Sequence, residues 1–194
     1  MKGTAHIKQL LDRVAAYGDE AAYKELFILL HRPLCQFAYG ILKSQDDAQE
    51  VVSDVFISLW EKREKLGDIS SPLVYLYTAV KNRSLNAIAK QKRQQALDAG
   101  EWLVPLSSVY FDPEKLMMTE EMIQQIRRAI NELPTRCRLI FKLVKEDGLK
   151  YREVAELLQL SVKTVEAQMA IAIRRLGKCM HLEINAPAKK PSEK

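Results

Sequence analysis

Apolar residues recur with the 3.6-residue period of an α-helix along most of this 194-residue chain. No long segment alternates between apolar and polar residues, as a half-buried strand would. Glycine and proline number seven each, and residues that favour helices are common. The sequence therefore predicts an all-α fold, with helices over about 21–43, 46–66, 72–93, 113–133, 135–146, 150–159 and 161–180.

The helical period fails in one internal stretch, where Gly100, Pro105 and Pro113 interrupt the pattern. This stretch predicts a linker between two small helical domains. It is apolar for a linker, since it contains Trp102 and Tyr110, and it could dock on a partner. The polar end of the chain predicts a disordered tail. The expected boundaries are domain 1–93, linker 94–113, domain 114–184 and tail 185–194.

Charge is distributed unevenly along the chain. The net charge is +3 over residues 1–95, −3 over 96–130 and +5 over 131–194. Two basic blocks separated by an acidic one fit a chain that touches a polyanion at two places. Ordinary solvated helix faces would produce the same pattern, so charge alone leaves both interpretations open.

Cysteine and histidine are sparse. Cys35, Cys137 and Cys179 form no CxxC pair, and an odd, dispersed set indicates a reducing compartment. The three histidines make no metal-ligand spacing with them. No apolar run approaches the roughly 20 residues that span a bilayer. The sequence predicts a cytoplasmic protein with no metal and no cofactor.

The segment from Gly148 to Leu176 has the pattern of a helix-turn-helix. A short helix is followed by a turn at Leu160 and by Ser161, a good N-cap residue. The second helix has an apolar stripe spaced 3, 4, 3 and 4, made of Val162, Val165, Met169, Ala172 and Leu176. Its opposite face carries Lys163, Ala167, Ala170, Ile171 and Arg174, with Thr164 beside them.

Small residues on that face allow close approach to a DNA groove, and Lys and Thr can bind phosphates or base edges. Glu166 opposes this interpretation unless its carboxylate accepts a hydrogen bond from a cytosine amino group. The alternative is a plain helical hairpin with a solvated face.

The predicted helix over 46–66 carries an acidic ridge, which we define as Asp47, Glu50, Asp54, Ser58 and Glu61. Carboxylates in a row would repel phosphate, but they could meet a basic protein surface. A solvated charged face is the alternative.

The predicted helix over 72–93 carries a second polar surface, which we call the amide stripe: Tyr75, Asn82, Asn86 and Arg93. These lie within about 40° of one another on an ideal helical wheel. Basic residues flank them: Lys81, Arg83, Lys90 and Lys92. Amides read base edges, aromatic rings stack on bases, and cations neutralise phosphate, which suits an opened strand. Asparagine forms helices poorly, which favours function over a solvated face.

Three segments, taken in order and spacing, resemble the extracytoplasmic-function (ECF) sigma factors, small two-domain specificity subunits of bacterial RNA polymerase. They are DDAQEVVSDVFISLWEKREKL, SPLVYLYTAVKNRSLNAIAKQKR and LPTRCRLIFKLVKEDGLKYREVAELLQLSVKTVEAQMAIAIRRL. The resemblance covers about residues 10–180. The phrases LPTRCRLIF and SVKTVE are most similar to the Bacteroidetes-type branch.

The resemblance implies a helical region 2 bundle and a region 4 helix-turn-helix. Asp47, Glu50 and Asp54 would dock on the clamp helices of the largest subunit of core RNA polymerase. The amide-stripe helix would open the promoter and recognise its minus-10 element, with Asn82 and Asn86 at base-reading positions. The linker would thread toward the active-site and RNA-exit channels. The minus-35 element would be read through Ser161, Lys163, Thr164, Ala167 and Gln168, beside Arg174.

The chain departs from the family at two of these positions: Glu166 stands where many members have a basic residue, and Tyr75 where many have Trp. An anti-sigma factor is a further expected partner. One alternative is a stand-alone helix-turn-helix regulator with a helical sensor or dimerisation domain. A helical enzyme has little support, because no nucleophile–base pair, metal cluster or phosphate loop is visible, and the sequence predicts no catalysis.

Overall fold

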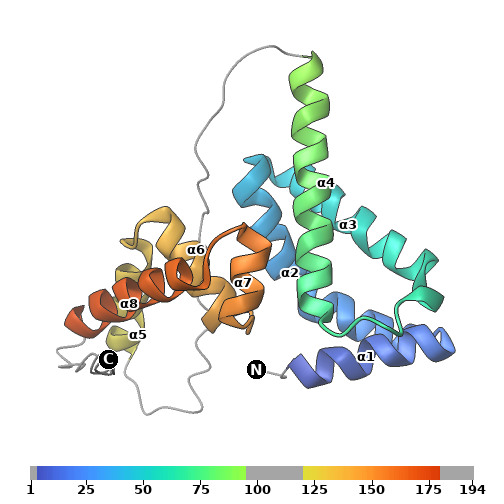
Figure 1. Cartoon of the computed structure of the whole chain (residues 1–194), viewed down its shortest axis with the longest axis horizontal. Helices are drawn as coiled ribbons and strands as arrows, with labels where there is room; N and C mark the ends of the chain where they lie inside the picture. The colour runs from blue at the N-terminus through green and yellow to red at the C-terminus, as the bar shows by residue number, and fades with distance from the viewer. Residues whose placement is uncertain (1–3, 95–119, 180–194) are drawn as a thin grey trace, which may run out of the picture.

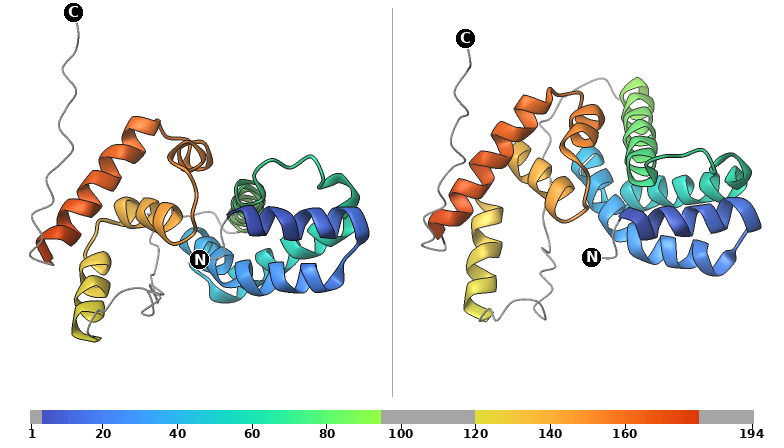
Figure 2. Two further views of the ribbon diagram at one scale, coloured as in Figure 1. Left: turned by 90° about the horizontal axis from the view of Figure 1, so that it is seen from below. Right: turned by 60° about the horizontal axis from the view of Figure 1, so that its bottom comes forward.

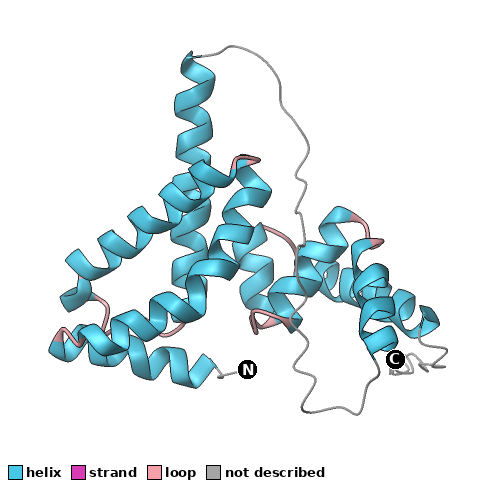
Figure 3. Ribbon diagram, turned by 180° about the vertical axis from the view of Figure 1, so that it is seen from behind, coloured by secondary structure: helices cyan, strands magenta, loops and turns pink. Residues whose placement is uncertain are grey.

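A computed structural model of the chain describes residues 4–94 and 120–179, with side chains described for 4–90 and 124–178. All regular structure in these residues is helical (Figure 3), which confirms the predicted all-α class. The helices form two groups, one from residues 4–94 and the other from residues 120–179, and the two groups are in contact (Figure 1).

The first group packs around one central helix. Its elements are α1 (Thr4–Tyr17), α2 (Glu20–Leu42), α3 (Gln45–Glu61), the short 3₁₀ helix η1 (Arg63–Lys65) and α4 (Pro72–Gln94). Helix α2 contacts α1, α3 and α4. Aromatic rings fill these contacts: Phe27 meets Phe56 at 4.8 Å, and Phe37 meets Tyr77 edge-on at 5.0 Å.

The turn between α2 and α3 is set by local backbone chemistry. Lys43 ends α2 in the left-handed conformation, with φ of 61°. Ser44 then caps α3, because its hydroxyl accepts the backbone N–H of Asp47 at 3.3 Å. With so short a connection, α3 packs back along α2, and it carries the acidic ridge with it.

Helix α1 was not predicted from the sequence. Ile7, Leu10, Leu11 and Val14 are buried and follow the i, i+3, i+4, i+7 spacing of a helix face. His6 contacts Glu25 of α2 at 3.0 Å. This apolar stripe was the sequence signal that could have predicted α1, but it spans a helix of only 14 residues.

The second group packs around α8. Its elements are α5 (Glu120–Asn131), α6 (Thr135–Lys145), α7 (Tyr151–Leu158) and α8 (Val162–Cys179), and α8 contacts the other three (Figure 2). The Cys137 thiol of α6 donates to the backbone carbonyl of Gln168 at 3.2 Å. The helix expected over 113–133 is described from Glu120 onward. The predicted linker beyond Gln94 and the predicted tail over 185–194 lie outside the described residues.

Over the residues that the structure describes, none of the helices has the length and hydropathy required to cross a membrane.

Candidate nucleic-acid interface

The amide stripe lies on the solvent-facing side of α4. Tyr75, Asn82 and Asn86 are exposed, and so is Lys90. The side chain of Arg93 lies outside the described residues. The opposite side of the helix is buried, through Leu73, Leu76, Tyr77, Val80 and Ser84. The packing therefore leaves two amides and one aromatic ring free to contact a ligand.

Two of the basic residues beside the stripe are held by other helices. Lys81 Nζ donates to the backbone carbonyl of Leu157 in α7 at 2.9 Å. Arg83 Nη1 donates to Asp54 Oδ2 in α3 at 2.8 Å, and its Nη2 donates to the Ser58 hydroxyl. Both side chains are half-buried as a result. The sequence did not indicate these partners.

The acidic ridge runs along α3. Glu50, Asp54 and Glu61 are exposed, while Asp47 and Ser58 are half-buried. Asp47 lies in the first turn of the helix, where a carboxylate favours the positive end of the helix dipole. Because Asp54 and Ser58 hold Arg83, the ridge is joined directly to the helix that carries the amide stripe.

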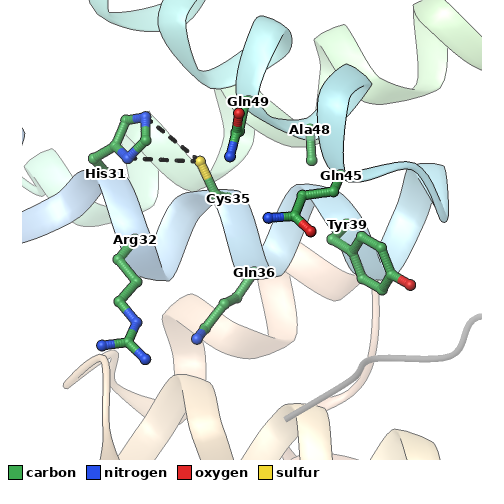
Figure 4. A pocket seen from close by; sticks show the side chains of 8 residues that line it. All are labelled: His31, Arg32, Cys35, Gln36, Tyr39, Gln45, Ala48 and Gln49. Atoms are coloured by element: carbon green, nitrogen blue, oxygen red, sulfur yellow. Dashed lines mark hydrogen bonds between the residues drawn. The ribbon is translucent and has the colours of Figure 1, made fainter. Parts of the chain in front are cut away.

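An open pocket of about 410 Å³ lies between the second half of α2 and the start of α3 (Figure 4). His31, Cys35 and Tyr39 line it from α2, and Gln45 and Gln49 line it from α3. Burial raises the pKa of the Cys35 thiol to about 11, so the group is a protonated thiol at neutral pH. Its sulfur lies 3.7 and 3.8 Å from the two ring nitrogens of His31.

The pocket was not predicted from the sequence. The signal that could have found it is the recurrence of His31, Cys35 and Tyr39 at every fourth position of α2. Among the described residues, no group of three or more His, Cys, Asp or Glu side chains could hold a metal ion.

Helices α7 and α8 form the predicted helix-turn-helix. Gln159 ends α7 in the left-handed conformation, with φ of 55°, and α8 begins three residues later. Of the predicted apolar stripe, Val165, Met169 and Ala172 are buried, while Val162 and Leu176 are half-buried and pack against the core. On the other face Ser161, Lys163, Glu166, Ala167, Ala170, Ile171 and Arg174 are exposed, while Thr164 and Gln168 are half-buried.

Ser161 caps α8. Its hydroxyl oxygen accepts the backbone N–H of Thr164 at 3.0 Å and also lies 2.8 Å from the Thr164 hydroxyl. These bonds fix the first turn of the helix, which is the part of a recognition helix that contacts base edges. Ser161 therefore positions Thr164 in addition to being exposed itself.

This cap makes a testable prediction. Ser161→Ala should reduce the free energy of unfolding by about 1 kcal/mol, because the Thr164 N–H loses the hydroxyl acceptor and keeps only the backbone carbonyl of Ser161. Ser161→Asp should keep the cap and the stability but weaken binding to duplex DNA, because it adds a negative charge near phosphate. Thermal unfolding and DNA titration measure the two effects. Equal DNA affinity for Ser161→Asp and the parent chain would contradict a DNA-facing position.

Comparison with known families identifies both groups of helices. The family described as "Sigma-70 region 2" matches residues 26–94, and "Sigma-70, region 4" matches residues 123–176. The first match contains α3 and α4, with the acidic ridge and the amide stripe. The second contains the helix-turn-helix.

Two curated relatives extend the similarity over most of the chain. The ECF RNA polymerase sigma-E factor of Escherichia coli (strain K12) is 26% identical over 171 residues, covering 82% of this chain and 86% of that protein. The ECF RNA polymerase sigma factor SigW of Bacillus subtilis (strain 168) is 24% identical over 159 residues, covering 78% and 85%.

Solved structures with a similar course of the chain include CnrH in complex with the cytosolic domain of CnrY. The TM-score is 0.49 at 19% identity, covering 90% of this chain and 97% of that one. The sigma factor RpoE in complex with the anti-sigma factor NepR from Bartonella quintana also has a TM-score of 0.49 at 19% identity, covering 84% and 98%. With both sigma-70 regions present in order and curated relatives of one kind along most of its length, the chain belongs to the ECF sigma factors.

Proposed function

We propose that this sigma factor binds core RNA polymerase, directs it to promoters and opens the DNA there, with each task assigned to a surface described above. The observation that carries the proposal is the exposed amide stripe on α4, inside the sigma-70 region 2 match. A solvated helix face would gain nothing from two asparagines one turn apart, because asparagine lowers helix stability.

The amide stripe would bind the minus-10 element as an opened strand. Asn82 and Asn86 would accept and donate hydrogen bonds at base edges, and Tyr75 would stack on a base. Lys90, Arg93 and, once released from their present partners, Lys81 and Arg83 would neutralise the backbone. Binding the unpaired strand offsets the loss of base stacking, which is a few kcal/mol per step.

The helix-turn-helix would bind the minus-35 element as duplex. The first turns of α8 would enter the major groove, through Ser161, Lys163, Thr164, Ala167 and Gln168, and Arg174 would contact phosphate farther along the helix. Ala167 permits close approach of the backbone. The exposed carboxylate of Glu166 would disfavour phosphate and tolerate a cytosine amino group, so it restricts which sequences bind well.

The acidic ridge would bind core polymerase. Asp47, Glu50 and Asp54 would meet a basic surface on the clamp helices of the largest subunit. Charge complementarity of this kind accelerates association and selects against partners of the same sign. It also keeps DNA phosphate off α3.

Other properties follow from the same assignment. The chain performs no catalysis itself, since phosphodiester bond formation belongs to the polymerase, and it works in the cytoplasm. Its control would come from an anti-sigma factor. The phrases LPTRCRLIF and SVKTVE support membership of the Bacteroidetes-type branch. With this assignment we propose the boundaries 1–93 for the first domain, 94–113 for the linker, 114–184 for the second domain and 185–194 for the tail. A stand-alone regulator is not favoured, because region 2 occupies the place of a sensor domain.

The deciding experiment mixes the purified chain with core polymerase and promoter DNA. The chain should co-elute with core and direct run-off transcription from a subset of genomic fragments. Failure of both would overturn the proposal.

Glu50→Lys, which reverses an exposed charge of the ridge, should weaken core binding by about tenfold or more. Glu156→Lys is the matched control, because Glu156 is an exposed glutamate of α7 outside the ridge, and it should leave core binding unchanged.

A further inference from the structure

The outer face of α8 carries an apolar surface that the assignments above use only in part. Ile171 is 36% exposed, and Ala167 and Ala170 beside it are also exposed. We call these three residues the apolar strip. Lys163 precedes the strip by one helical turn and Arg174 follows it, so the strip lies between two cations on the same face of the helix.

The side chain of Ile171 is suited to a fixed contact. A β-branched side chain in a helix keeps one χ1 rotamer about 90% of the time, so little conformational entropy is lost when it binds. The two alanines have no heavy atoms beyond Cβ, so they let the helix backbone approach the floor of a groove. On the opposite side, the buried residues Val165 and Met169 hold α8 against the other helices of its group.

The apolar strip favours one base among the four. The 5-methyl group of thymine is the apolar group that base pairs present in the major groove. Guanine, adenine and cytosine present donors and acceptors there, which an alkyl side chain would desolvate without replacing their bonds to water. Burial of one methyl group against alkyl carbon corresponds to about fourfold in an equilibrium constant. An apolar strip on a recognition helix therefore selects thymine.

The length of the strip limits how many bases it reads. From Ala167 to Ile171 the helix rises about 6 Å, and successive base pairs are about 3.4 Å apart. Glu166 lies about 140° around the helix from Ile171, so its carboxylate faces a different base. The strip therefore faces one or two neighbouring positions, and the polar residues of α8 face the others.

We propose that the apolar strip reads thymine through its 5-methyl group, so that the minus-35 element of this chain carries thymine at the one or two positions that face Ile171. The exposed apolar surface at Ile171, between two cations of the same face, carries this inference. It rests on the proposed function, because it assumes that α8 enters the major groove of the minus-35 element.

The test begins with the sequence that the chain selects. Promoter fragments that direct run-off transcription are synthesised again with their minus-35 region randomised, and reconstituted holoenzyme selects among them. Thymine should be enriched at one or two neighbouring positions. Deoxyuridine then replaces thymine at each of these positions, which removes the methyl group and keeps every hydrogen-bonding group. At the position that faces Ile171, holoenzyme should bind the uracil fragment about fourfold more weakly.

Two variants assign this effect to one side chain. Ile171→Ala removes the contact, so its ratio of thymine to uracil affinity should fall from about four to about one. Ile28→Ala is the matched control, because Ile28 is an exposed isoleucine of α2, outside the sigma-70 region 4 match, and it should keep the ratio. The ratio is taken within each variant, so a change in core binding cancels.

A change of specificity gives a second measurement. Ile171→Arg should shift the preferred base at the facing position from thymine to guanine, because arginine bonds guanine O6 and N7. The other selected positions should stay the same. Uracil that binds as well as thymine at every position, or an Ile171→Arg variant that selects the parent sequence, would contradict the inference alone. A holoenzyme that selects no minus-35 sequence would contradict the proposed function as well, since α8 would then read no duplex.

Discussion

The double variant Asn82→Ala/Asn86→Ala is expected to bind an opened minus-10 strand about 100-fold more weakly, or worse, while unfolding at a higher temperature. Each well-placed hydrogen-bonded pair between an amide and a base contributes about 1–3 kcal/mol of discrimination. Two such pairs that each contribute about 1.4 kcal/mol correspond to about 100-fold in affinity. Both side chains are exposed, so no packing is lost. Alanine is the better helix former, by roughly 0.5 kcal/mol at each position.

These opposite signs separate recognition from folding. Fluorescence anisotropy of a labelled promoter with an unpaired minus-10 segment, in complex with reconstituted polymerase, measures the first effect, and thermal unfolding measures the second. Asn131→Ala is the matched control, because it removes an exposed amide from α5. It should leave DNA binding unchanged. If the double variant instead lost affinity for core polymerase to the same degree as for DNA, Asn82 and Asn86 would not be base readers.

Lys142→Met is expected to produce the largest loss of stability among single changes to the polar residues described. Lys142 is 3% exposed and lies 3.5 Å from both Glu146 and Asp147. Methionine preserves the length of the side chain but leaves two largely buried carboxyl groups without a cation. Removing one partner from a buried ionic cluster destabilises a protein by about 3–5 kcal/mol.

The loss should depend on pH in a defined direction. Burial raises the pKa of Asp147 and of Glu146 above their ordinary values, and Lys142 opposes this rise. Since the folded chain then binds these protons more tightly than the unfolded chain, the free energy of unfolding falls as pH rises above about 4. Without Lys142 the rise in pKa is larger, so Lys142→Met should be most destabilised at pH 8 and less so at pH 5.

Thermal unfolding followed by circular dichroism at the two pH values checks this. Lys145→Met is the matched control, because Lys145 lies one turn away in the same helix and is exposed. If Lys142→Met and Lys145→Met unfolded alike at both pH values, the ionic cluster would contribute nothing to stability.

Much of the fold was predictable because apolar spacing reports which side of a helix is buried. The stripe Val165, Met169 and Ala172 is buried as expected, and the face of α4 that carries Asn82 is exposed as expected. Helix α1 was missed, although its stripe through Leu10 and Val14 has the same spacing. A short stripe near the end of a chain gives a weaker signal than a long one.

The contacts of the charged residues were not predictable in the same way. Lys81 and Arg83 read as solvent-facing cations, but each bonds to a group 76 or 29 positions distant in sequence. Lys142 was not singled out in the sequence, yet it is buried at the end of α6 and pairs with Glu146 and Asp147. Periodicity assigns a residue to a face of its own helix, whereas these partners depend on how separate helices come together.

The bond between Lys81 and Leu157 joins two parts of one molecule, so dilution does not weaken it. The effective concentration of α7 at α4 is fixed by the chain that connects them, whatever the amount of protein in the cell. A DNA phosphate must therefore compete for Lys81 with the Leu157 carbonyl at every protein concentration. The contact between α4 and α7 therefore lowers the fraction of chains in which Lys81 is available by the same factor at every protein concentration.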